Sequence, residues 1–108
     1  DFSFNVHSTE LLLTAAERSG VGSFVLASSA AVYGDERPHP LSEAEEPRPG
    51  SDYARSKWEA AIVATRSSIS TVALRIFNVY GATLADSLVA RLVASTPAAP
   101  VDLRDLDA

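Results

Sequence analysis

Tyr53 and Lys57 are the residues of this chain whose types and spacing point most directly to chemistry. They lie four positions apart, so on a helix both side chains project from the same face. An ammonium group near a phenol stabilises the phenolate. A tyrosine tuned in this way can donate a proton to a substrate oxygen or remove one from it. The alternative is a tyrosine packed at a helix start beside a solvated lysine, and two residues alone do not decide between the two interpretations.

Ser28 and Ser29 follow the short apolar run Phe24-Val25-Leu26-Ala27, which is typical of a strand buried on both faces. In open α/β sheets, ligands bind at the carboxyl ends of the strands. A serine hydroxyl at this point could therefore hydrogen-bond a substrate oxygen. The alternative is that the two serines only form a turn.

The elements that must position these residues alternate between helix and strand. Residues 4–19 carry apolar side chains at helical spacing, and Gly20 suits the left-handed conformation that ends a helix. The apolar members of this pattern are Leu11, Leu12, Ala15 and Ala16. After the first strand we expect a long loop from Gly34 to Gly50, because its prolines forbid a regular helix or a central strand.

A second helix is expected to follow Ser51, which is a suitable N-cap, and to run to about Arg66. Its predicted buried stripe consists of Ala54, Trp58, Ala61, Ile62 and Thr65. Residues 71–77 are typical of a second buried strand, and residues 78–81 of a turn. A last helix is expected to hold Leu88, Val89, Leu92 and Val93 and to be ended by Pro97 and Pro100.

The order helix, strand, helix, strand, helix predicts an α/β fold with parallel strands joined by a right-handed crossover. Two strands alone make a poor sheet, so we expect neighbouring strands from sequence outside these 108 residues. The abrupt start at Asp1 and stop at Ala108 also favour a segment of a longer protein.

Composition and charge argue against several classes of function. The net charge is −5 and Lys and Arg do not cluster, which argues against a nucleic-acid or anionic-membrane partner. The chain has no cysteine, and its two histidines lack metal-ligand spacing, so we expect neither a disulfide nor a metal site. No stretch is apolar enough to span a membrane. We therefore expect a globular protein in the cytoplasm.

Four blocks of the sequence resemble, in order and spacing, the extended short-chain dehydrogenases/reductases of the NAD-dependent epimerase/dehydratase family, in their UDP-glucose 4-epimerase-like form. The blocks are residues 5–16, 20–34, 53–57 and 74–81. Several ordered blocks are more specific than one short motif. The resemblance implies a Rossmann-like doubly wound parallel sheet. Residues 1–108 would be its central NAD-binding segment, lacking the Gly-rich N-terminal part and the C-terminal substrate region.

The resemblance also implies a role for each matching residue. Ser29 matches the catalytic serine or threonine, Tyr53 the general acid/base, and Lys57 the lysine that favours the phenolate and hydrogen-bonds the nicotinamide ribose. Positions matching the cofactor pocket are Asn5, Ala27, Ser28, Tyr53, Lys57, Ile76 and Phe77. Positions matching the substrate site are Ser29, Ala30 and Asn78, the last being the asparagine that touches the sugar-nucleotide diphosphate.

The implied activity is that of an NAD-dependent nucleotide-sugar epimerase, with hydride transfer at C4 of the hexose; NADP is a possible cofactor too. A nucleotide-sugar 4-ketoreductase is one alternative. A non-catalytic NAD(P)-fold binding or sensor protein is another, although it would be expected to have lost Ser29, Tyr53 or Lys57. Dehydrating relatives carry an Asp-Glu pair directly after the serine or threonine. This chain has Ala30 and Ala31 there, so no dehydration is expected.

The resemblance extends to the quaternary structure. The helices that begin near Asn5 and Ser51 resemble those that build a four-helix dimer interface in this family. We therefore expect a homodimer. Trp58 and Ile62 could face either that partner or the sheet.

Overall fold

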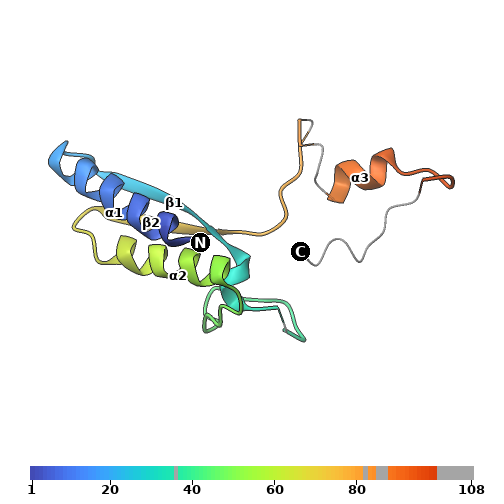
Figure 1. Ribbon diagram of the computed structural model, residues 1–108, viewed down its shortest axis with the longest axis horizontal. Helices are drawn as coiled ribbons and strands as arrows, with labels where there is room; N and C mark the ends of the chain where they lie inside the picture. The colour runs from blue at the N-terminus through green and yellow to red at the C-terminus, as the bar shows by residue number, and fades with distance from the viewer. Residues whose placement is uncertain (36, 82, 85–87, 100–108) are drawn as a thin grey trace. The chain divides into compact units, whose positions relative to one another are not determined.

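The structure is a computed structural model that describes residues 1–35, 37–81, 83–84 and 88–99 (Figure 1). The chain divides into two units, Asp1–Ile76 and Phe77–Ala108, and each is described by itself. The first unit contains α1 (Ser3–Arg18), β1 (Ser23–Ser29), the 3₁₀-helix η1 (Ala30–Tyr33), α2 (Asp52–Thr65) and β2 (Ser70–Ile76). The second contains α3 (Leu88–Ala94). The predicted alternation of helix and strand is confirmed, and η1 is the one element added to it.

Local chemistry fixes the helix ends of the first unit. At the start of α2, the Ser51 hydroxyl accepts a hydrogen bond of 3.1 Å from the backbone N–H of Ala54, as expected of an N-cap. At the end of α1, Gly20 takes a φ of 70°. The Val21 N–H then bonds the carbonyl of Ala16 at 3.0 Å, which satisfies a carbonyl that the helix itself leaves free. Both predicted helix boundaries are confirmed.

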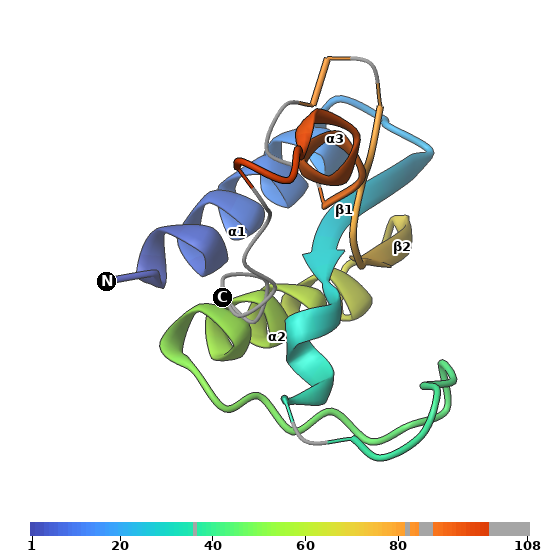
Figure 2. The same cartoon turned by 90° about the vertical axis from the view of Figure 1, so that its right-hand side faces the viewer.

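The strands β1 and β2 are parallel neighbours, in register from Ser23 opposite Ser70 to Ser29 opposite Ile76. The chain passes from β1 to β2 through η1, the 34–50 loop and α2 (Figure 2). Because parallel strands end at the same edge of a sheet, Ser29 and Ile76 share the carboxyl edge. β2 ends at Ile76, one residue before the predicted strand end at Phe77.

Helices cover one face of this sheet. α2 packs against both strands, and α1 packs along α2 (Figure 1). The buried apolar residues are Leu13, Val32, Tyr33, Ala54, Ala60, Ala61, Ala64 and Ile69. On the other face, Val25 is 63% and Val72 53% exposed. The prediction that the first strand is buried on both faces is therefore wrong for the unit Asp1–Ile76, because its helices pack on one face of the sheet only.

The predicted helix stripes are only partly right. On α1, Leu11 and Leu12 are each 59% exposed, and Thr9 and Leu13 are the buried residues. On α2, Ala54 and Ala61 are buried as predicted, together with Ser56, Ala60 and Ala64, which the prediction missed. Trp58 and Ile62 are half-buried, and Thr65 is exposed. The side chains that α2 buries are all small, so the helix meets its neighbours through alanine and serine while its larger side chains lie at the margin.

In the second unit, α3 ends at Ala94, ahead of Pro97. A pair of backbone hydrogen bonds between Thr96 and Ala99 follows the helix. Pro100, the second proline expected to end this helix, lies outside the described residues. Within the described part of the chain, no helix is long and apolar enough to cross a membrane.

Candidate active site

The first turns of α2 position Tyr53 and Lys57. Because the Ser51 cap starts the helix at Asp52, Tyr53 lies in its first turn and Lys57 one turn later. The Lys57 Nζ lies 5.8 Å from the centroid of the Tyr53 ring, so both side chains lie on the same side of the helix, as their spacing predicted. The Phe2 ring meets the Tyr53 ring edge-on, with centroids 5.4 Å apart. Tyr53 remains 38% exposed, so it is accessible to a ligand.

Lys57 connects this helix to the carboxyl end of β1. Its Nζ donates a hydrogen bond of 3.1 Å to the carbonyl oxygen of Ala27, two residues before Ser29. An ammonium group has three N–H donors. The bond to Ala27 uses one of them, so Lys57 keeps donor capacity for a ligand.

Asn5 is tied to the same turn of α2. Its Nδ2 donates a hydrogen bond of 3.0 Å to the Ser56 hydroxyl, which in turn donates at 2.7 Å to the carbonyl of Tyr53. Ser56 is buried, so this link holds the start of α1 against the turn that carries Tyr53. The sequence pattern gave Ser56 no role of its own, although the residue lies within the 53–57 block of the family resemblance.

Ser28 and Ser29 end β1 and face opposite sides of the sheet, as successive strand residues do. The Ser29 hydroxyl oxygen accepts a hydrogen bond of 3.1 Å from the N–H of Ala31, so Ser29 caps η1 and keeps its own hydroxyl proton for donation. The Ser28 hydroxyl is buried and has no hydrogen-bond partner among the described residues. Such a buried hydroxyl is an exception to the usual pairing of buried polar groups.

The structure thus gathers Asn5, Ala27, Tyr53 and Lys57 through direct contacts and hydrogen bonds, and Ser28 and Ser29 follow Ala27 directly in β1. Ala30 opens η1, and Ile76 ends β2 opposite Ser29. Phe77 and Asn78 begin the second unit, so they are described apart from Tyr53 and Ser29.

The two carboxyl groups with shifted pKa values lie outside this cluster. The His39 hydrogen bond, with smaller contributions from His39 and Arg37 charge, lowers the pKa of Glu45. The Ser67 hydroxyl and the Ser68 N–H lower the pKa of Glu17. Glu45 and its partners lie in the 34–50 loop, and Glu17 joins α1 to the residues that follow α2. Neither carboxylate contacts the Tyr53–Lys57 pair through these hydrogen bonds. Within the described residues, no group of three or more His, Cys, Asp or Glu side chains could hold a metal ion.

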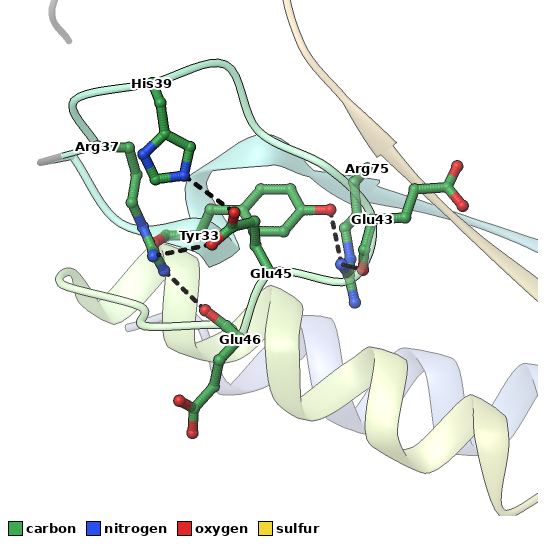
Figure 3. A network of polar contacts seen from close by, with 7 residues as sticks. All are labelled: Tyr33, Arg37, His39, Glu43, Glu45, Glu46 and Arg75. Atoms are coloured by element: carbon green, nitrogen blue, oxygen red, sulfur yellow. Dashed lines mark hydrogen bonds and ion pairs between the residues drawn. The ribbon is translucent and has the colours of Figure 1, made fainter.

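Two residues next to the cluster were not singled out by the sequence pattern. Arg75 of β2 donates a hydrogen bond of 2.7 Å to the phenol oxygen of Tyr33 in η1 (Figure 3). Both residues lie within blocks that carry the family resemblance. That placement was the only signal in the sequence, because the contact joins residues 42 positions apart.

A parallel sheet with helices packed on it, and a serine, a tyrosine and a lysine at its carboxyl edge, is characteristic of a Rossmann-like α/β protein. A model of the NAD dependent epimerase/dehydratase family matches residues 2–99. The chain belongs to this family, and the predicted membership in the extended short-chain dehydrogenases/reductases is confirmed.

Individual relatives carry the same family features. The UDP-glucose 4-epimerase of Rhizobium leguminosarum bv. trifolii is 38% identical over 82 residues, which is 72% of this chain and 25% of the relative. The dTDP-glucose 4,6-dehydratase of Streptomyces griseus is 42% identical over 66 residues, 61% of this chain and 20% of the relative. The solved structure of MoeE5 in complex with UDP-glucose and NAD matches with a TM-score of 0.71 and 37% identity, over 87% of this chain and 33% of that chain. The chain therefore spans at most about a third of the length of these proteins.

Proposed function

We propose that the protein carrying this chain is an NAD-dependent nucleotide-sugar epimerase that acts at C4 of the hexose. The observation that carries the proposal is the hydrogen bond from Lys57 Nζ to the Ala27 carbonyl. It brings the Tyr53–Lys57 pair of α2 to the end of β1, where Ser29 offers a hydroxyl proton. These are the three groups that a proton relay at a sugar hydroxyl requires.

NAD is the proposed cofactor, and the residues at this edge fit its nicotinamide end. The Lys57 ammonium has donor capacity left for ribose hydroxyls. Ser28 is included in the proposed pocket on the family resemblance alone, because its hydroxyl is buried on the covered face of the sheet. Asn5 and Ala27 complete the proposed pocket. When bound, NAD supplies the hydride acceptor and donor, and the protein supplies placement and proton transfer.

Tyr53 acts as the general acid/base in this proposal. It removes the proton of the 4-hydroxyl as C4 is oxidised, and the Lys57 ammonium lies beside its ring, with Nζ 5.8 Å from the centroid. The Ser29 hydroxyl donates a hydrogen bond to the same sugar oxygen and keeps its proton, while its own oxygen accepts from the Ala31 N–H. The 4-keto sugar then turns over. Hydride returns to the opposite face of C4 and Tyr53 returns the proton to the oxygen, which gives the epimer.

The residues after Ser29 favour epimerisation over dehydration. Elimination of water in dehydrating relatives resembling this chain uses an Asp-Glu pair at the positions of Ala30 and Ala31, and methyl groups cannot carry protons. The Streptomyces griseus dehydratase is 42% identical over 66 residues, so overall similarity does not distinguish the two reactions. The proposal of epimerisation therefore rests on the side chains at these two positions.

The proposed substrate is a nucleotide-diphosphate hexose, with Ala30 and Asn78 among the substrate-contacting residues. A homodimer through α1 and α2 is also proposed. Its support is the apolar surface that α1 leaves exposed, with Leu11 and Leu12 each 59% and Phe4 73% exposed. Trp58 does not support this interface. The Arg75 guanidinium of β2 lies 5.7 Å from the centroid of its ring, which places Trp58 on the side of the sheet.

The deciding experiment is Tyr53→Phe in the full-length protein, assayed with UDP-glucose. Turnover should fall by about 10²–10⁴-fold, because only the phenol hydroxyl is lost, while NADH binding stays nearly intact. Tyr80→Phe removes a hydroxyl from a tyrosine that is 71% exposed and should leave turnover unchanged. Near-normal turnover by Tyr53→Phe would contradict the assignment. Product analysis separates the reaction classes: the 4-epimer is expected, and a 4-keto-6-deoxy sugar formed at a catalytic rate would overturn the proposal.

A further inference from the structure

The orientation of Ser29 depends on η1, the short helix that follows it. Ser29 caps η1 through the hydrogen bond from the Ala31 N–H to its hydroxyl oxygen, so a movement of η1 moves this acceptor. η1 contains only Ala30–Tyr33. A 3₁₀-helix of this length has few hydrogen bonds of its own and poorer bond geometry than an α-helix. Contacts from outside must therefore hold it in place.

The 34–50 loop supplies part of this support. The Arg48 N–H donates a hydrogen bond of 2.8 Å to the carbonyl of Val32. Arg37 Nε donates at 3.0 Å to the carbonyl of Tyr33, and its other nitrogens reach the carbonyl of Glu46 at 2.7 Å and the carboxylate of Glu45 at 3.4 Å (Figure 3). These hydrogen bonds tie η1 to the loop, and η1 also packs directly against α2, which carries Tyr53 and Lys57.

Arg75 adds side-chain contacts to both η1 and α2. It lies next to the last residue of β2, in register with Ser28. Its Nη1 donates to the Tyr33 hydroxyl at 2.7 Å and, at 3.4 Å, to the carbonyl of Glu43. Its guanidinium carbon lies 4.8 Å from the centroid of the Tyr33 ring and 5.7 Å from that of Trp58. One planar cation thus contacts η1, the loop and the α2 residue that follows Lys57.

We propose that Arg75 is a positioning residue: it fixes η1 relative to α2 and thereby holds Ser29 in place relative to Tyr53 and Lys57. The inference rests on the proposed function and adds a residue that touches neither substrate nor cofactor. Tyr33 is 2% exposed, so the hydrogen bond and the ring contact are shielded from water. A guanidinium stacks on aromatic faces while it donates hydrogen bonds in a fixed plane, which an ammonium cannot do.

The expected consequence is a loss of turnover without a loss of binding. A displacement of about 1 Å at a reacting group can lower a rate by about 10²-fold. The residues proposed to bind the nicotinamide end, Asn5 and Lys57, make their contacts through α1, α2 and Ala27. Their contacts do not pass through Arg75, so the dissociation constant for NADH should not change.

The test compares Arg75→Met, Arg75→Lys and Tyr33→Phe in the full-length protein, with Arg66→Met of an exposed arginine as the matched control. Arg75→Met should lower kcat by about 10²-fold with KM and NADH affinity unchanged. Arg75→Lys should recover little of this loss. Tyr33→Phe keeps the ring and loses only the hydroxyl, so its kcat should lie between those of Arg75→Met and the wild type. A raised KM with unchanged kcat would instead show that Arg75 binds the substrate diphosphate, which overturns the proposal.

Hydrogen exchange provides a readout that does not depend on activity. In Arg75→Met, the peptide spanning η1 should exchange faster than in the wild type, while the peptide of β1 keeps its protection. Unchanged protection of η1 would overturn the proposal even if activity fell. If Arg75→Met does not fold, the same comparison with Tyr33→Phe decides the matter. A wild-type protein that neither binds NADH nor converts a nucleotide sugar would refute the proposed function alone, since the exchange measurement would still report whether Arg75 holds η1.

Discussion

Gly34, which follows η1, offers a quantitative test of how tightly the 34–50 loop is joined to Ser29. Its φ of 89° and ψ of 169° lie in a region of backbone conformation that only glycine adopts readily. A Cβ at this position would lie 2.6 Å from the carbonyl oxygen of Arg48. That oxygen belongs to the backbone of the residue whose N–H bonds Val32, so no side-chain rotation can relieve the overlap.

The expected destabilisation by Gly34→Ala follows from these two effects. Backbone strain of this kind costs about 1–3 kcal/mol. Relief of the overlap by a shift of Arg48 would also weaken its hydrogen bond to Val32, worth about 1 kcal/mol. The smaller conformational entropy of unfolded alanine offsets about 0.4–1 kcal/mol. The free energy of unfolding should therefore fall by roughly 2–3 kcal/mol.

Two other glycines separate strain from overlap. Gly20 has a φ of 70°, but a Cβ added there would meet nothing within 4 Å, so Gly20→Ala should cost only the strain, about 1–2 kcal/mol. Gly50 has neither feature, and Gly50→Ala should be neutral or slightly stabilising. Urea unfolding of the full-length variants, followed by circular dichroism, measures the order. If Gly34→Ala proves as stable as Gly50→Ala, the argument that the loop closely constrains η1 is refuted.

Two further predictions concern charged side chains. Lys57→Met should weaken NADH binding and lower turnover, because the ammonium is proposed to donate hydrogen bonds to the ribose and its bond to Ala27 joins α2 to the end of β1; an NADH affinity equal to that of the wild type would count against Lys57 as a cofactor-binding residue. The pKa of Glu17 is lowered from its ordinary value of 4.5, chiefly by the Ser67 hydroxyl. The carboxylate therefore stabilises the folded state above pH 4.5, and this contribution is lost as the pH falls through the lower pKa of the folded state. The stability difference between wild type and Glu17→Gln should therefore shrink on acidification in urea titrations, and a difference independent of pH would refute the linkage.

The features that could be predicted from the sequence are those set by neighbouring residues. Ser51 and Gly20 bound their helices because a hydroxyl and a missing Cβ act within one turn. The spacing of Tyr53 and Lys57 placed both on one face of a helix for the same reason. The elements expected to carry Ser29 and Tyr53 also agree with the structure, since these residues lie at a strand end and in a first helical turn.

The features that could not be predicted depend on which elements meet. Leu11 and Leu12 are exposed although they fit a helical apolar pattern, because a pattern does not say whether a neighbouring element covers it. Ser56 is buried because α1 lies against α2 and Asn5 supplies its hydrogen-bond donor. The pairing of Arg75 with Tyr33 needs β2 and η1 to be adjacent, and neither residue carries a local signal for the other.

The two ties between α2 and the end of β1 should contribute differently once a cofactor is bound. Lys57 reaches Ala27 with the same ammonium that is proposed to donate to the ribose, so this side chain serves both the protein contact and the cofactor. Arg75 makes its contacts with Tyr33, Trp58 and the loop, all of which are protein groups. This is why loss of Arg75 should appear in kcat, whereas loss of Lys57 should appear in both binding and turnover.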